Sequence, residues 1–197
     1  MFDFDGVLID TLLPCHAINA EVNKDLDLEE YKSFFDGNIH DAVRKNGEPR
    51  KAHPQFSEKY ESLVRTLEIP DILKESVHTL SKTYTLVIIS STYTSSIDEI
   101  LKRENIRECF TLLLGADIHR SKVVKIGMVL DEYKVEAKDC VFITDTLGDI
   151  REATTCNIPS IAVTWGFHER ENLEKGQPIA ILDDPTTLVS TIENVLK

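Results

Sequence analysis

The sequence has few basic residues for its number of acidic ones, with 22 Lys and Arg against 34 Asp and Glu and a formal net charge of −12. Nucleic acids and anionic membrane surfaces are bound through clustered Lys and Arg side chains, which displace counterions. We therefore expect neither nucleic acid nor a membrane among the partners of this protein.

Long apolar runs and a secretory leader are also missing. The longest apolar stretches, such as 86–89 and 112–114, are far shorter than the roughly 20 residues that span a bilayer. No basic segment followed by an apolar one precedes the first acidic residues, so we predict no secretory signal. The four cysteines form neither a CxxC pair nor a zinc-binding spacing: Cys15, Cys109, Cys140 and Cys156. These absences predict a cytoplasmic protein with reduced thiols.

Glycine is scarce as well, and its eight residues form neither GxGxxG nor GxxxxGK[ST]. These two motifs bring backbone N–H groups to the phosphates of nucleotides. Dinucleotide-binding and P-loop folds are therefore disfavoured. A receiver domain also gathers Asp, Ser or Thr and Lys, but its acceptor Asp would follow a later strand than the first.

From about residue 71 onward, short apolar runs alternate with stretches of helical periodicity. The alternation is typical of βαβ units, and runs rich in Val, Ile and Leu are typical of parallel strands buried on both faces. We expect strands at 86–89, 111–114, 140–144, 161–164 and 179–182, and helices at 71–82, 95–104, 121–133, 150–155 and 185–196. The predicted fold is α/β, with a Rossmann-like, doubly wound parallel sheet.

Residues 12–70 have a different pattern, because their apolar positions recur at helical spacing and include no strand-like run. Two helix faces are expected, one with Leu26, Leu28, Tyr31, Phe34 and Phe35, the other with Phe56, Tyr60, Leu63, Val64 and Leu67. We therefore predict two domains. Residues 1–11 and 71–197 would form an α/β core, and residues 12–70 an inserted α-helical domain.

Two carboxylates, Asp3 and Asp5, stand at the point where a first strand is expected to end, and Gly6 follows them. A glycine permits a tight turn, so the two carboxylates can point in different directions and take different chemical roles. Asp10 is a favoured helix N-cap type, and we expect it to cap the next helix instead.

Hydroxyl and ammonium groups follow at the next two strand ends. Ser90, Ser91 and Thr92 offer hydroxyls and backbone N–H groups to a phosphoryl oxygen, although an ordinary strand-to-helix turn explains them equally well in isolation. Lys122 opens an expected helix, where its ammonium could pair with a carboxylate and a phosphate. Lys125 is a competing candidate one turn later.

Two further carboxylates, Asp145 and Asp149, come just after the strand expected at 140–144. Acidic groups that lie close together repel one another unless a hard cation such as Mg²⁺ neutralises them. Alternatively, Asp149 could stabilise the N-terminus of the next helix through the helix dipole. In a doubly wound sheet, ligands bind outside the carboxyl ends of the strands, where Asp3, Ser90 and Asp145 are all expected.

The order and spacing of these residues resemble the four motifs of the haloacid dehalogenase (HAD) superfamily of phosphatases and phosphotransferases. Residues 3–11 (DFDGVLIDT) are similar to the first motif, Ser90 to the second, Lys122 to the third, and Asp145 with Asp149 to the fourth. The gap of 23 residues between Lys122 and Asp145 favours Lys122 over Lys125. The position of the helical insertion resembles the subclass with an α-helical cap, and phosphoglycolate-phosphatase-like members are the nearest comparison.

The resemblance implies a Mg²⁺-dependent phosphatase of a small phosphorylated metabolite, acting as a monomer or weak homodimer. Asp3 would attack phosphorus and form an aspartyl phosphate, and Asp5 would serve as general acid and base. Ser90 and Lys122 would bind the transferring phosphoryl group. Mg²⁺ would be held by Asp3, Asp145, the backbone carbonyl of Asp5, and Asp149 directly or through a second layer of contacts.

The cap would select the substrate, with Gly37 and Asn38 as the expected contact turn and Ser91 as a further contact. A basic stretch in the cap could receive a second anionic group or form a solvated helix face: Arg44, Lys45, Arg50 and Lys51. His168 follows a later strand and could act as an acid or base, but a single loop histidine is more often structural, so it is not predicted to be catalytic.

Two alternatives to the phosphatase stay open, a sugar phosphomutase with the same catalytic groups and a non-catalytic binding or regulatory protein. Dehalogenases of the family lack an acidic residue at the position of Asp5, so its presence favours phosphoester chemistry. Phosphonate hydrolysis would need a Schiff-base lysine from the cap, and no lysine there is a recognisable candidate. Only Met1 and Phe2 precede Asp3, so the first strand is expected to be shorter than is usual in the family.

Overall fold

The strands of the computed structural model, which describes residues 1–39 and 53–197, pair only in parallel. They are β1 (Leu86–Ile89), β2 (Phe110–Leu114), β3 (Phe142–Thr144), β4 (Ser160–Val163) and β5 (Ala180–Leu182). β1 pairs with β2, and β4 lies between β3 and β5. The structure confirms the predicted α/β fold with a parallel sheet, and each strand begins or ends within two residues of its expected bounds.

The N-terminal residues join these two groups of strands. Phe2 exchanges two backbone hydrogen bonds with β1, of 2.8 and 2.9 Å, and forms bridges to both Ile88 and Ile143. On its other side, the N–H of Asp3 donates to the carbonyl of Ile143 in β3 at 2.9 Å. The expected first strand is thus short, yet its backbone lies at the centre of the sheet and carries Asp3 with it.

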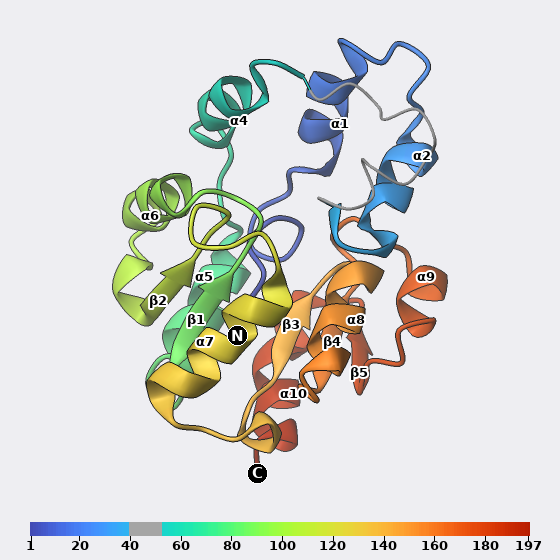
Figure 1. Ribbon diagram of the computed structural model, residues 1–197. Coiled ribbons are helices and arrows are strands. Elements are labelled where there is room, and N and C mark those ends of the chain that lie inside the picture. Colours follow the sequence, from blue (N-terminus) through green and yellow to red (C-terminus); the bar gives the residue numbers. More distant parts are fainter. Residues whose placement is uncertain (40–52) are drawn as a thin grey trace.

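Helices cover both faces of the sheet, as a doubly wound fold requires (Figure 1). They are α5 (Asp71–Leu80), α6 (Thr94–Arg103), α7 (Lys122–Tyr133), α8 (Leu147–Thr155), α9 (Arg170–Glu174) and α10 (Leu188–Val195). Alternate residues of β1 face opposite cores, because side chains alternate along a strand. Ile88 packs in the core that includes α5, α6 and α10, whereas Val87 and Ile89 pack in the core of α7 and α8.

Two helices begin three residues away from their predicted starts, and the other predicted helix boundaries of the core lie within two residues. α8 begins at Leu147 rather than at residue 150, because the side chain of Thr146 caps it by accepting a hydrogen bond from the N–H of Asp149. The last helix was predicted as one unit from residue 185. Instead, a 3₁₀ turn over Pro185–Thr187, capped by Asp184, precedes α10. α9 was not predicted.

Within residues 12–39 and 53–70, all the regular secondary structure is helical and is joined by turns and irregular segments. It forms α1 (Leu12–Ala20), α2 (Leu28–Ser33), the 3₁₀ turn η1 (Phe34–Asp36) and α4 (Phe56–Val64), and α1 packs against both α2 and α4. These helices lie above one end of the sheet (Figure 1). We propose that they form a cap domain separate from the core. The basic residues predicted there lie outside the described residues: Arg44, Lys45, Arg50 and Lys51.

None of the helices in the described ranges is long and apolar enough to cross a membrane.

The central position of Phe2 can be tested by stability measurements. Its ring is 1% exposed and packs edge-to-face against Phe110, with centroids 6.1 Å apart. We expect Phe2→Ala to lower the free energy of unfolding by about 3–5 kcal/mol in a denaturant titration. Leu13→Ala removes an apolar side chain that is 59% exposed, and it should change stability by less than about 0.5 kcal/mol. Equal effects of the two substitutions would contradict a central role for Phe2.

Candidate active site

Side chains from four separate parts of the chain meet at the carboxyl end of the sheet. Asp3 follows the central N-terminal residues, Ser90 follows β1 and Asp145 follows β3, and all three line one cavity together with Lys122 at the start of α7. The ammonium of Lys122 lies 2.7 Å from Asp3 Oδ2 and 2.6 Å from Asp149 Oδ2. The structure therefore brings together the acidic and basic residues that the sequence singled out.

The buried carboxylates differ in how easily they lose a proton. Burial raises the pKa of Asp3 well above its usual value, although the charge of Lys122 opposes this. Burial would also raise the pKa of Asp149, but the charge of Lys122 and hydrogen bonds, including one from Thr144 Oγ1 (2.8 Å), hold it below its usual value. Burial alone would lower the pKa of Lys122, but the negative charges of Asp149 and Asp3 raise it above its usual value.

Asp145 lies in a tight pocket formed by two glycines. A Cβ atom on Gly6, whose φ is +74°, would be 1.9 Å from Asp145 Oδ2, and a Cβ on Gly166 would be 2.4 Å from Asp145 Cβ. Asp145 Oδ2 accepts a hydrogen bond from the N–H of Phe167 at 2.8 Å. The sequence indicated Gly6 for its turn, whereas the need for Gly166 is visible only in the structure.

Asp145 Oδ1 is buried and accepts no hydrogen bond from the residues that the structure describes. Such an atom carries a large desolvation penalty unless it meets a positive group. No group of three or more His, Cys, Asp or Glu side chains in the described ranges is arranged to hold a metal on its own. Mg²⁺ commonly needs only one or two carboxylates and keeps several waters. The side chains of Asp3 and Asp145 fit this ion.

Three hydroxyl groups hold the carboxylate of Asp5. Its Oδ1 accepts hydrogen bonds from Thr11 Oγ1 at 2.8 Å and from the Tyr60 hydroxyl at 2.7 Å. Its Oδ2 accepts one from Thr92 Oγ1 at 2.6 Å. Asp5 thus faces away from the Lys122 cluster, as the turn at Gly6 predicted. The sequence placed Tyr60 only on an apolar face of a cap helix, and no local signal indicated its contact with Asp5.

Ser90 and the two candidate lysines take distinct positions. Ser90 is fully buried, and its Oγ accepts a hydrogen bond from the N–H of Thr92 at 3.0 Å. The Lys125 ammonium donates to the Ser90 carbonyl at 2.5 Å, behind this loop, and burial lowers the pKa of Lys125 to about 8. Lys122, not Lys125, contacts the carboxylates. Ser91 is exposed and lines the cavity.

The predicted contact turn at Gly37 and Asn38 lies on the core. A Cβ on Gly148 in α8 would be 2.4 Å from the Gly37 carbonyl oxygen, so only a glycine permits this approach. The side-chain amide of Asn38 donates to Glu152 Oε1 at 3.1 Å, and the same oxygen accepts the N–H of Lys122 at 3.0 Å. Both turn residues line the cavity, and their contact with a substrate stays a prediction.

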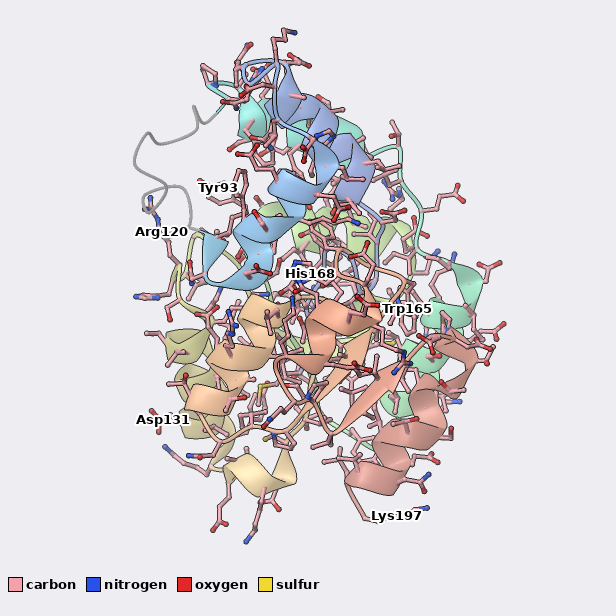
Figure 2. All side chains as sticks on the ribbon, turned by 90° about the vertical axis from the view of Figure 1, so that its right-hand side faces the viewer. Tyr93, Arg120, Asp131, Trp165, His168 and Lys197 are labelled. Atoms are coloured by element: carbon pink, nitrogen blue, oxygen red, sulfur yellow. The ribbon has the colours of Figure 1, made fainter. Side chains whose placement is uncertain are left out.

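His168 connects the cap segment to the core. It is 1% exposed, and its Nδ1 accepts a hydrogen bond from the N–H of Leu147 at 3.0 Å. Its Nε2 therefore carries the proton and donates to the carbonyl of Lys32 at 3.0 Å. Figure 2 shows His168 at the boundary between the blue cap segment and the core. Both ring nitrogens are engaged in these links, in agreement with the expected structural role.

The pH dependence of stability tests the environment of Asp145. Burial raises its pKa to about 7, so metal-free folded protein keeps a proton there that the unfolded chain releases near pH 4. The folded state should therefore lose about 2 kcal/mol as the pH rises from about 5 to about 7. Denaturant titrations with a chelator should show this loss in the wild type and a smaller one in Asp145→Asn.

Magnesium supplies the second half of this test. An ion that binds the ionised carboxylates of the folded state stabilises that state, so we expect Mg²⁺ to raise the melting temperature of the wild type at pH 8. The same addition should have little effect on Asp145→Asn. Parallel pH profiles for the two proteins, or equal stabilisation by Mg²⁺, would contradict this assignment of Asp145.

Three known proteins match this chain along nearly its whole length. The phosphoglycolate phosphatase of Synechococcus elongatus is 22% identical over 207 residues, covering 100% of this chain and 98% of that protein. The crystal structure of a predicted phosphatase from Clostridium acetobutylicum superposes with a TM-score of 0.77 at 21% identity, covering 98% of this chain and 96% of that one. A haloacid dehalogenase-like family hydrolase from Streptococcus pneumoniae superposes with a TM-score of 0.74 at 22% identity, covering 97% and 96%.

At these identities the solved structures show the fold alone, and the family is shown by a direct match. The model of the family described as haloacid dehalogenase-like hydrolase matches residues 1–163, which include Asp3, Ser90, Lys122 and Asp145. This chain belongs to the haloacid dehalogenase-like hydrolases, as the order of its motifs predicted.

Proposed function

We propose that this hydrolase is a Mg²⁺-dependent phosphatase that cleaves monoesters of small phosphorylated metabolites through an aspartyl phosphate on Asp3. The observation that carries the proposal is the divergence of two neighbouring carboxylates. Asp3 points to the Lys122 ammonium, whereas Asp5 points to three hydroxyl groups. One carboxylate is thus available as a nucleophile beside a cation, and the other as a proton carrier.

Asp3 would attack phosphorus with one carboxylate oxygen, and the bond from phosphorus to the alcohol oxygen would break. Bound Mg²⁺, held by Asp3, Asp145 and the backbone carbonyl of Asp5, would supply positive charge to the phosphoryl oxygens. Lys122 and the Ser90 hydroxyl would add a cation and a hydrogen-bond donor for the same oxygens. Asp149 would keep the Lys122 ammonium in place through its 2.6 Å contact.

Asp5 would move the protons of both steps. In its protonated form it would donate to the departing alcohol oxygen, and as a carboxylate it would then take a proton from the water that hydrolyses the aspartyl phosphate. Tyr60 and Thr92 fix the orientation of the two Asp5 oxygens through bonds of 2.7 and 2.6 Å. Because Tyr60 belongs to α4, a cap residue helps to orient the proton carrier.

The nucleophile is tested by Asp3→Asn. We expect purified wild-type protein to release phosphate from an aryl phosphate only when Mg²⁺ is present. Asp3→Asn should lower kcat on the order of a thousandfold or more, because the amide cannot form the intermediate. Asp10→Asn is the matched control at an exposed carboxylate that accepts the N–H of Leu12, although the N-cap position of α1 belongs to Thr11 and not to Asp10 as expected. Full turnover by Asp3→Asn would reject Asp3 as the nucleophile.

The orientation of Asp5 is tested by Tyr60→Phe, which removes one hydroxyl and keeps the ring. Losing a hydrogen bond to a charged group costs about 1.5 kcal/mol, so we expect kcat to fall about tenfold. KM should change less than about twofold, because the hydroxyl touches Asp5 and not the phosphate. Tyr93→Phe makes the same change at an exposed residue of the cavity lining and should leave kcat unaltered. An unchanged kcat in Tyr60→Phe would exclude the positioning role.

A further inference from the structure

A cavity of about 660 Å³ extends from the candidate active site into the cap helices. The cap touches the core on both sides of it, through the Tyr60 hydroxyl on Asp5 and through Gly37 against Gly148. The volume is therefore the room that remains while the cap is in contact with the core. It lies within the roughly 300–1,000 Å³ range of small-molecule sites. The two-carbon acid glycolate would fill little of this space.

Two groups of aromatic side chains line the cavity, and they come from the cap helices and from one loop of the core. One group combines α2 and η1 with the loop after β4: Tyr31, Phe34, Phe35 and Phe167. Within it, the rings of Phe35 and Phe167 pack edge-to-face with centroids 4.7 Å apart. A second group on α4 consists of Phe56 and Tyr60, which are stacked at 5.9 Å. Such walls suit a planar apolar ring.

The charged residues of the lining disfavour a second anionic group on the ligand. Beyond the catalytic carboxylates, the described lining includes three further acidic residues: Glu61, Asp117 and Glu152. Its cations are engaged or exposed, since Lys122 contacts Asp3 and Asp149, and Arg120 is exposed to solvent. His53 Nε2 lies 3.1 Å from a carboxylate oxygen of Glu21. Among the described residues of the lining, a carboxylate would meet more negative than positive charge.

We propose that the substrate is the monophosphate of an uncharged alcohol that carries an aromatic ring, with the ring held by these two aromatic groups. Such an alcohol is larger than glycolate, can contact the aromatic faces and adds no negative charge beside the acidic residues of the described lining. The proposal rests on the phosphatase activity proposed above. It separates this chain from a phosphatase of phosphoglycolate, whose leaving group is small and anionic.

Four phosphate esters compared as substrates test this preference. Benzyl phosphate and propyl phosphate are both esters of primary alcohols, so their phosphorus–oxygen bonds have similar reactivity and the ring is the main difference. We expect kcat/KM for benzyl phosphate to exceed that for propyl phosphate at least about tenfold, and that for 2-phosphoglycolate by more. Glucose 6-phosphate is the ester of an alcohol that is uncharged but strongly polar, and it should also be a poorer substrate than benzyl phosphate.

The outcomes distinguish this proposal from the phosphatase activity on which it rests. If no ester is cleaved with Mg²⁺, including an activated aryl phosphate, the proposed phosphatase activity itself is wrong. If 2-phosphoglycolate, propyl phosphate or glucose 6-phosphate is cleaved as well as benzyl phosphate, the phosphatase activity stands and the aromatic preference is wrong.

Two substitutions assign the preference to the cavity. Phe35→Leu and Phe56→Leu keep an apolar side chain but remove one ring from each aromatic group. Each should lower kcat/KM for benzyl phosphate about fivefold and leave that for propyl phosphate nearly unchanged. Tyr84→Leu removes a half-buried ring outside the cavity lining and should alter neither value. Melting temperatures verify folding, and an equal loss for both esters would reject ring recognition.

Discussion

The ammonium group of Lys122 lies between the carboxylates of Asp3 and Asp149, and the arrangement of the site depends on this contact. Asp3, Asp145 and Asp149 are all buried, and burial alone would raise the pKa of each of them. The Lys122 ammonium, which contacts two of these carboxylates, cannot neutralise all three. Asp149 stays ionised beside Lys122, while Asp3 and Asp145 are left in need of further positive charge. A divalent ion fits this need, and it would bring the cluster to a balance that suits an anionic substrate.

The start of α8 connects the charge cluster to the cap. Within three consecutive residues, the N–H of Leu147 donates to His168, Gly148 admits the Gly37 carbonyl, and Asp149 binds Lys122. A displacement of the cap segment would therefore disturb the same helical turn that carries Asp149. On the opposite side of the cap, the Tyr60 hydroxyl donates a hydrogen bond to Asp5. We infer that the cap helices act on the positions of the reacting groups as well as on the choice of substrate.

Much of the core could be predicted from the sequence, because its signals are local or repeat along the chain. The apolar runs predicted each strand to within two residues at either end, and the order of the motifs predicted the family that the direct match confirmed. Spacing also favoured Lys122 over Lys125, and the structure places Lys122 on the carboxylates. The predicted start of α8 was wrong because the side chain of Thr146 caps the helix three residues earlier than the weak apolar periodicity indicated.

The sequence by itself determined which polar side chains gather at one edge of the sheet, since residues that follow parallel strands meet at the carboxyl ends of those strands. Only the tertiary structure decided the contacts of Tyr60, Gly166 and His168. These contacts join segments that are distant along the chain, and each depends on how the cap and loops are packed, which leaves no periodic or local trace. The net charge of −12 predicted that nucleic acids and anionic membranes are not partners. The fold then buried three carboxylates near the Lys122 ammonium and left Asp145 Oδ1 without a partner among residues 1–39 and 53–197, a concentration of charge that composition alone could not reveal.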